Sequence, residues 1–325
     1  MPAFNPYKGR REVAVLGIEA TPGVVAANQY MYRWLDKGLK TIPGILENES
    51  AVGQDTRVND SAIDTWHSEG PLGGKVTENG IAILMHGMLN KVTTTDNTDG
   101  TFTHAFVRDR SVARKSLSFW DVTPAGTFLY KSLYMDNLSM TVEVGEQGAW
   151  LEASTALKGW KEESVTPITP ALDTTEKEFT SRHVSIVFAD DVAGLAAAPR
   201  VKARSVELSF EESATVDHSV GEVNDDPEFD FAPQEVKGTM VVKYRNTEFT
   251  EDYFANKIHA AKLLVKNGDS SIEIIGTKVR FREVTKSEGR DDTVTQTISF
   301  YFEADDTNGG QDVVCNITNT LASIV

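Results

Sequence analysis

The sequence has almost no cysteine and no long apolar run, and both absences restrict what the protein can be. Cys315 is the only cysteine among 325 residues, so an internal disulfide is excluded and nothing indicates an oxidising compartment. No uninterrupted apolar stretch approaches the roughly 18 residues that a membrane-spanning helix requires. Residues 1–15 carry Lys8, Arg10 and Arg11 without an apolar segment behind them, so no secretory signal is predicted. We expect a protein that is made in a reducing cytoplasm and has no membrane partner.

Positive charge is scarce as well. The chain has 32 Lys and Arg against 48 Asp and Glu, which gives a formal net charge of -16. Phosphate binding needs clustered Lys and Arg, so this balance argues against a surface that grips nucleic acid. DNA that only passes by would be repelled rather than bound. The hydrophobic share of 40% is enough for the core of one large domain or of two ordinary ones.

Sequence patterns of catalysis and metal binding are missing too. The chain contains no nucleophile elbow (G-x-S-x-G), no phosphate-binding G-x-x-x-x-G-K-[ST] and no dinucleotide-binding G-x-G-x-x-G. The six histidines are scattered without zinc-site spacing, and Cys315 lacks the local signature of a catalytic nucleophile. Residues 96–100 resemble a calcium loop without its final acidic ligand, so a turn is favoured. We predict no catalytic residue, no cofactor and no metal site.

The pattern that dominates the sequence is an alternation of apolar and polar residues. It runs through residues 138–144, 206–211 and 294–302, which are rich in Val, Ile, Thr and aromatic residues. Successive side chains of a strand point to opposite faces, so each segment is predicted to be a strand with one buried and one wet face. Turn-forming residues separate such segments. A mainly β fold follows.

Helical periodicity is clear in two short places only. A first helix is predicted to begin after Thr77 and to continue through residues 81–89, where apolar residues recur at intervals of three and four. A second helix is predicted from Thr250, with Glu251 and Asp252 in its first turn. Both helices are short, so they accompany the strands rather than define the fold.

The order of these elements repeats along the chain. In each half, a short strand, a helix, a second strand and a long hairpin follow one another. We interpret this as a degenerate duplication, with one β domain in residues 1–160 and another in residues 200–325. Residues 161–199 would form a linker with one apolar strand at 184–188. The period is far longer than that of solenoid repeats. The alternative is that two unrelated β domains both carry a helix.

Two loop-like segments have an unusual charge. Residues 211–235 contain nine acidic residues and no Lys or Arg. This length is too great for a tight turn, and long loops usually have a function or are disordered. Asp225, Asp226 and Glu228 could supply carboxylates for a hydrolase, but no recognisable base or nucleophile accompanies them, so a solvated acidic loop is favoured. Residues 286–292 carry both signs of charge, which suits electrostatic register between copies.

Taken in order, several segments resemble the tail tube proteins of long-tailed phages, in particular the longer type with two halves. The resemblance covers nearly the whole chain, although each motif alone is short. The linker and the acidic segment depart from it. The segments that carry it are residues 13–23 (VAVLGIEATPG), 47–50 (ENES), 73–76 (GGKV), 102–106 (FTHAF), 138–144 (LSMTVEV), 236–242 (VKGTMVV), 278–281 (KVRF) and 297–303 (TISFYFE).

The resemblance implies a mainly β fold of two tandem domains, each a β-sandwich or partly closed barrel with a short flanking helix. It also implies that subunits form rings, that the rings stack, and that the sheets of all subunits join into one inner barrel. Such closure removes the unpaired strand edges of the monomer. If the halves are true repeats, three chains would form a pseudo-sixfold ring; otherwise six chains would be needed.

In such a tube, an acidic lumen would let DNA pass without binding it. The candidate lumen acids are Glu143 and Glu207, on the wet faces of alternating strands. Candidate contacts between stacked rings come from the two charged segments and are Lys286, Glu288, Arg290, Asp291, Asp225 and Asp226.

The resemblance further implies a place in the virion tail, assembly in the bacterial host cytoplasm, and DNA as a transient cargo. The implied partners are other copies of the chain and the tape-measure, terminator and tail-tip proteins. Two alternatives stay open. The chain could be another tail component of the same fold, such as a terminator or tail-tip ring, or a non-catalytic carbohydrate-binding β-sandwich module.

Overall fold

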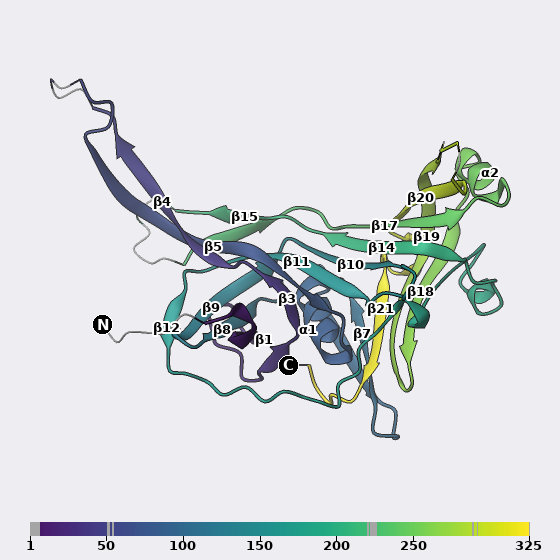
Figure 1. Cartoon of the computed structure of the whole chain (residues 1–325), viewed down its shortest axis with the longest axis horizontal. Helices are drawn as coiled ribbons and strands as arrows, with labels where there is room; N and C mark the ends of the chain where they lie inside the picture. Colours follow the sequence, from purple (N-terminus) through teal and green to yellow (C-terminus); the bar gives the residue numbers. More distant parts are fainter. Residues whose placement is uncertain are drawn as a thin grey trace.

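A computed structural model describes residues 7–50, 53, 55–219, 221, 226–287, 289–290 and 292–324 and shows a mainly β protein (Figure 1). The strands are β1 (Val13–Ile18), β2 (Tyr30–Tyr32), β3 (Trp34–Lys37), β4 (Lys40–Asn48), β5 (Asp60–Lys75), β6 (Lys91–Asp96), β7 (Phe102–Val107), β8 (Leu117–Thr123), β9 (Gly126–Met135), β10 (Asn137–Glu143), β11 (Glu152–Gly159), β12 (Glu163–Val165), β13 (Val184–Ala189), β14 (Ala203–Glu211), β15 (Ala214–Asp217), β16 (Glu228–Phe231), β17 (Glu235–Lys243), β18 (His259–Asn267), β19 (Ser270–Lys286), β20 (Thr295–Phe302) and β21 (Val314–Asn319). The α-helices are α1 (Glu78–Met88) and α2 (Glu248–Phe254), and short 3-10 turns lie at Gly9–Arg11, Ser181–His183, Ala193–Ala196 and Asp306–Asn308. The mainly β class expected from the alternating pattern is confirmed.

One long antiparallel sheet crosses the molecule in the order β5–β11–β10–β14–β17–β20–β19. Strand β19 belongs to two parts of this sheet. Its second half pairs with β20, whereas its first half pairs with β21, which is followed by β7 and β6. On its other side β19 pairs with β18, and β18 pairs with β13. The sheet therefore turns a corner along β19.

A smaller sheet lies against the first and has the order β2–β1–β8–β9–β12. The end of β9 also pairs with β11, where Met135 faces Leu157. The two sheets are thus joined at this point. Together with the turned-back strands β21 and β7, they surround α1, as expected for a sandwich that is partly closed into a barrel.

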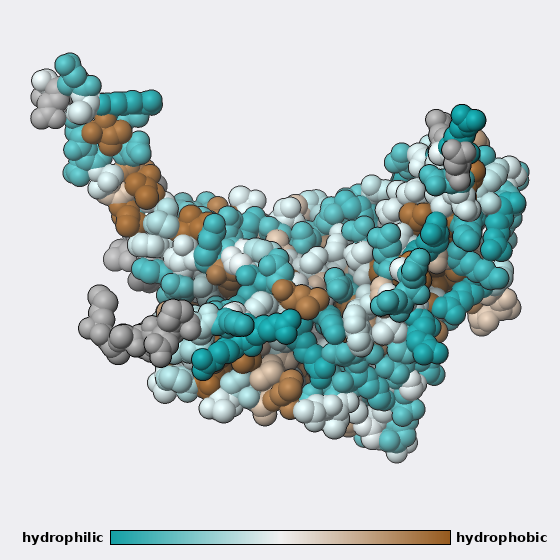
Figure 2. All heavy atoms as spheres, in the orientation of Figure 1, coloured by the Kyte–Doolittle hydropathy of each residue, from teal (hydrophilic) through white to brown (hydrophobic). Residues whose placement is uncertain are grey.

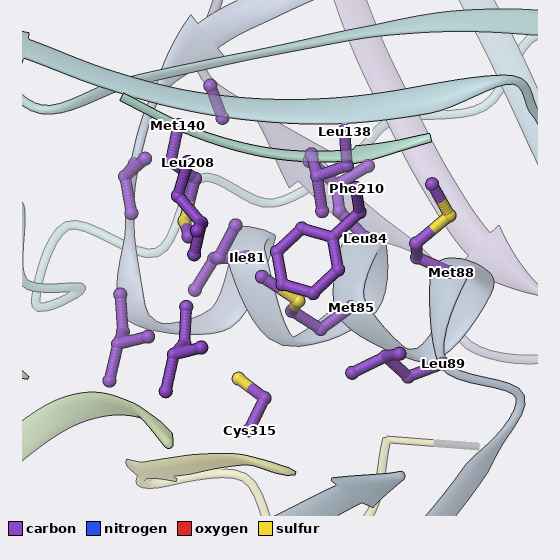
Figure 3. Packing of buried hydrophobic residues seen from close by; sticks show 14 of the residues in the cluster. Ile81, Leu84, Met85, Met88, Leu89, Leu138, Met140, Leu208, Phe210 and Cys315 are labelled. Carbon is purple, nitrogen blue, oxygen red and sulfur yellow. The ribbon is translucent and has the colours of Figure 1, made fainter. Parts of the chain in front are cut away.

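The core is built around α1. The inward side chains of β10 and β14, among them Met140, Leu208 and Phe210, point at the helix, and Cys315 of β21 lies on its other side (Figure 3). All residues of α1 except Gly87 are buried. Burying this apolar surface is the main force that holds sheet and helix together. Both helices are expected to flank the strands. This position applies to α2, which buries no residue, whereas α1 lies in the core.

The start of α1 agrees with the sequence pattern. Thr77 is the N-cap, and its side-chain oxygen accepts a hydrogen bond of 3.2 Å from the backbone N–H of Gly80. The start of α2 differs from the pattern, because this helix begins at Glu248 rather than after Thr250. Glu248 extends the acidic first turn, where negative charge stabilises the helix dipole.

The linker and the acidic segment hold more structure than their sequences indicate. The strand expected at residues 184–188 is β13, and the linker also contributes β12. Within the described part of residues 211–235, β15 and β16 form an antiparallel pair rather than an irregular loop. The direct pairing of β10 with β14 joins strands from the two predicted domains. The division at residues 161–199 stays a prediction.

Candidate functional site

The side of the long sheet that faces away from α1 is a polar surface, which we call the outer face. Antiparallel register places one residue from each of five neighbouring strands in a row across it: Glu152, Thr141, Glu207, Thr239 and Ser299. All five are exposed or half-buried. The next row contains Ser154, Ser139, Ser209, Lys237 and Tyr301. The outer face thus consists mainly of short hydroxyl side chains, with scattered charged groups of both signs, namely Glu152, Glu207 and Lys237.

Both predicted lumen acids belong to the outer face. Glu143 lies opposite Ser205, and Glu207 lies two residues further along the same strand as Ser205. Residues two apart on one strand share a face, so the two carboxylates are diagonal neighbours on the outer face. Both are exposed, and neither forms an ion pair with another residue that the structure describes. Their placement in a lumen stays a prediction.

A two-stranded hairpin projects from the sheet (Figure 1), and we call residues 40–67 the arm. Residues 68–75 of β5 pair with β11, but among the described strands residues 60–67 pair only with β4. The side chains of Ile45 and Ile63 lie opposite each other on the arm and are 59% and 54% exposed. Figure 2 shows hydrophobic residues along this projection. Exposed apolar side chains on an isolated hairpin indicate a surface that another molecule covers.

Residues 47–50 carry part of the family resemblance, but the sequence does not predict the arm. The reason is that Pro43 and Gly44 interrupt β4, and both residue types are disfavoured in strands. The apolar residues Ile45 and Leu46 are also adjacent, so the period of two is lost there. The available signal was the pair of apolar residues Ile45 and Ile63 on either side of a polar turn.

A second extended feature, which we call the ribbon, continues the sheet beyond its edge. Strand β14 runs on into β15, and β16 runs on into β17, so two antiparallel strands extend from the pairing of Ala203 with Val242 to that of Asp217 with Glu228. We call the far end of the ribbon, around the pairing of Asp217 with Glu228, the tip. Asp226 is exposed there, as predicted for a loop. Its neighbour in the prediction, Asp225, lies outside the described residues. Phe229 and Phe231 pack on the ring of Tyr134 at 5.1 and 5.0 Å between ring centroids, which fixes the tip to the body.

The other predicted contact segment lies at the opposite end of the ribbon. Lys286 and Arg290 are exposed there, and the Lys286 ammonium lies 3.7 Å from the ring centroid of Tyr244, directly after β17. Glu288 and Asp291 lie outside the described residues. The structure therefore does not bring the two predicted contact groups together. It places them at opposite ends of one element, as two different surfaces.

Among the residues that the structure describes, these surfaces hold no assembled group of reactive side chains. Cys315 is fully buried, and burial raises the pKa of its thiol well above the usual range, so it is a poor nucleophile. In the described parts of the chain, no group of three or more His, Cys, Asp or Glu side chains is arranged to hold a metal ion. The helices among the described residues are too short or too polar to cross a bilayer. The outer face, the arm and the ribbon therefore present contact area, charge and hydroxyl groups.

Buried histidines behave as core residues. Burial lowers the pKa of His104, whose Nε2 lies 3.0 Å from Oδ1 of Asn319 and whose Nδ1 lies 2.8 Å from Oγ1 of Thr94. Burial also lowers the pKa of His86 in α1 to about 4. Both rings are neutral near pH 7, and His104 connects β7 with β21 through Asn319.

The sequence matches a known protein family over most of its length. A family model of the phage tail tube protein matches residues 9–302, from just before β1 to the end of β20. The match spans nearly the whole sequence and includes the arm, the ribbon and the outer face. No curated protein matches the chain at a significant level.

Proposed function

Because the chain belongs to the family of phage tail tube proteins, we propose that copies of it form rings which stack into the tube through which DNA leaves the virion. The family membership makes it a structural component of a phage tail. The steps beyond that, namely self-assembly, the tube as a conduit and passive conduction of DNA, are the proposal. It also holds that the chain performs no catalysis.

The observation that carries self-assembly is the arm. A two-stranded hairpin is marginally stable alone in water, and this one exposes the cross-strand pair Ile45 and Ile63. Fully burying an Ile side chain contributes about 1.5–3 kcal/mol relative to leaving it exposed. Covering the arm with a neighbouring subunit would therefore stabilise both the arm and the contact.

The outer face supports the role of a conduit. A tube that releases DNA quickly needs a wall without clustered cations, because phosphate groups bind Lys and Arg. The hydroxyl groups of the outer face are uncharged, and Glu143 and Glu207 add repulsion toward phosphates. We therefore assign the outer face to the lumen side of the ring.

The ring would contain three chains if the two halves are equivalent around its axis, and six if they are not. Tape-measure, terminator and tail-tip proteins would contact the ends of the tube, and assembly would take place in the host cytoplasm. A terminator or tail-tip ring of the same fold is the second candidate function. It would form one closed ring instead of a polymer.

Negative-stain electron microscopy of the purified, concentrated protein tests the proposal. Hollow tubes or stacked rings with a central hole are expected, and their end views distinguish three from six chains. Single rings that never stack would indicate a terminator rather than a tube protein. Dispersed monomers at every concentration would contradict self-assembly.

The role of the arm is tested with the double variant Ile45→Ser, Ile63→Ser. It should raise the concentration needed for assembly at least roughly tenfold, because two exposed Ile side chains are no longer buried. The matched control is Leu172→Ser, Val192→Ser, which removes two apolar side chains of similar exposure outside the arm. Normal tubes from the arm variant would exclude the arm from assembly.

A further inference from the structure

A cluster of cations lies at the end of the ribbon opposite the tip, on a protein that is acidic as a whole. Arg200 and Lys202 lie just before β14 and Arg204 lies at its start. Lys243 and Arg245 lie where β17 ends. The pairing of β14 with β17 brings the two groups together. All five side chains are exposed, and none of them forms an ion pair with another described residue. Their charge is therefore available to a partner.

These cations line a groove. Residues 200–202 line two cavities of about 270 and 280 Å³. The floor of the groove is apolar on both sides, with Val142 and Val184 on one side and Phe188 and Phe249 on the other. Glu248 is the only acidic residue among the described residues that line it. A groove with an apolar floor and a basic rim suits a polypeptide that presents carboxylates, more than it suits a bare phosphate backbone.

The tip of the ribbon has the opposite charge. Asp217 lies directly opposite Glu228, and Asp230 lies two residues from Glu228 on the same strand. All three are exposed, and none forms an ion pair with another residue that the structure describes. The neighbouring Phe229 and Phe231 pack on Tyr134 of the same chain, so the tip presents mainly carboxylates.

The groove and the tip of one molecule cannot meet each other. They lie at the two ends of the same ribbon, and the strand from Ala203 to Asp217 spans roughly 45 Å at about 3.3 Å per residue. The tip is also held to the body through Tyr134. A complementary pair of surfaces that cannot close within one molecule is arranged to close between two.

We propose that the acidic tip of the ribbon of one copy docks in the basic groove of the next copy. The contact joins two unlike surfaces, so every docked copy still has a free tip or a free groove. Such heterologous contacts generate rings or open polymers rather than closed pairs. This inference rests on the proposed function for the shape of the product, and it adds the surfaces and the charge that set the direction of assembly.

Charge reversal at each surface tests the docking. Each variant alone places like charges against each other, so self-association measured by sedimentation velocity should require at least roughly tenfold more protein than the wild type. Rising salt should weaken wild-type association, because exposed charges are screened. The groove variant carries Arg200→Glu, Lys202→Glu and Arg204→Glu, and the tip variant carries Asp217→Lys, Glu228→Lys and Asp230→Lys.

The decisive measurement is the mixture of the two variants. The basic tip of one variant then meets the acidic groove of the other, and the acidic tip of the second meets the basic groove of the first. Association should return toward the wild-type concentration in the mixture, and also in a chain that carries all six changes. Circular dichroism checks that each variant is folded, and a variant that is unfolded is replaced by its Gln or Asn counterpart, which removes the charge without reversing it.

Several results would overturn the proposal. A matched control reverses three exposed cations elsewhere, Lys8→Glu, Arg10→Glu and Arg11→Glu; equal loss of association in this control would assign the effect to net charge. If the wild type forms tubes and both variants associate as strongly as the wild type, the docking proposal is wrong and the proposed function is intact. Absence of any wild-type association would remove both. Binding of labelled duplex DNA by the wild type but not by the groove variant, without rescue in the mixture, would assign the groove to nucleic acid.

Discussion

The backbone N–H of Ser132 donates a hydrogen bond of 3.0 Å to Oε1 of Glu19, and both residues are buried. Glu19 follows β1, whereas Ser132 lies in β9, so the bond joins two strands of the smaller sheet. The same carboxylate accepts hydrogen bonds from the hydroxyl groups of Ser116 and Ser118 and from the backbone N–H of Gly23, at 2.7, 2.8 and 3.0 Å. A buried carboxylate is stable only when it is hydrogen-bonded in this way.

Replacing Glu19 by Ala should destabilise the folded subunit by at least about 3 kcal/mol, because three buried donors and one half-buried donor lose their common acceptor. Replacement by Gln should cost less, since one acceptor oxygen stays in place. Urea unfolding followed by tryptophan fluorescence measures the change. The control Glu146→Ala alters an exposed side chain and should change stability by less than about 0.5 kcal/mol. A loss below about 1 kcal/mol for Glu19→Ala would contradict the structural role of this carboxylate.

Replacing Ser132 by Gly should stabilise the subunit by about 1 kcal/mol. Ser132 has a φ of 48°, a left-handed conformation that costs little for Gly, and its hydroxyl is buried without a hydrogen-bond partner among the described residues. Thermal unfolding measures the effect. Ser132→Ala also removes the hydroxyl but keeps the Cβ atom, so the Gly variant should be the more stable of the two. The opposite order would show that the backbone is not strained at this position.

The buried His86 should make the fold sensitive to acid. Burial, with smaller contributions from Lys115 and His104, lowers the pKa of His86 from 6.5 in the unfolded chain to about 4. Between these values the unfolded chain binds a proton at this residue and the folded chain does not, so stability falls as the pH drops from 6.5 to 4. The expected loss from this residue is about 3 kcal/mol.

The variant His86→Leu isolates this contribution. It should lose about 3 kcal/mol less than the wild type over the same pH range, because every other titrating group is present in both proteins. Denaturant unfolding at a series of pH values provides the comparison. Parallel stability curves for the two proteins would show that His86 is protonated as easily in the folded state as in the unfolded state.

Removing one of the facing negative charges at the ribbon tip should stabilise the subunit and weaken its self-association. Asp217 faces Glu228 across β15 and β16, and like charges directly opposite in a sheet destabilise it. Asp217→Lys should therefore stabilise the subunit by roughly 0.2–1 kcal/mol and weaken self-association. The control Glu146→Lys makes the same change of charge at an exposed residue outside the ribbon and should alter neither quantity. A variant that lowers stability and leaves association unchanged would contradict both expectations.

The sequence by itself determined the local features of the fold. The alternation in residues 138–144 and 206–211 correctly separated the side chains that face α1 from those of the outer face. Thr77 correctly marked the start of α1. These features depend on residues close together in the chain, because the period of two and the N-cap bond both act over a few residues. For the same reason, Glu143 and Glu207 could be recognised as exposed acids.

Only the tertiary structure decided which segments meet. Alternation assigns the faces of β10 and β14 but contains no information about which strand lies beside which, and their pairing placed Glu143 and Glu207 on one face. Three of the four donors to Glu19 come from segments about a hundred residues away, and the basic groove unites Arg204 with Lys243. The arm and the ribbon likewise exist only as pairs of strands. Such features depend on register and on contacts between distant segments, and the pattern of a single segment does not encode them.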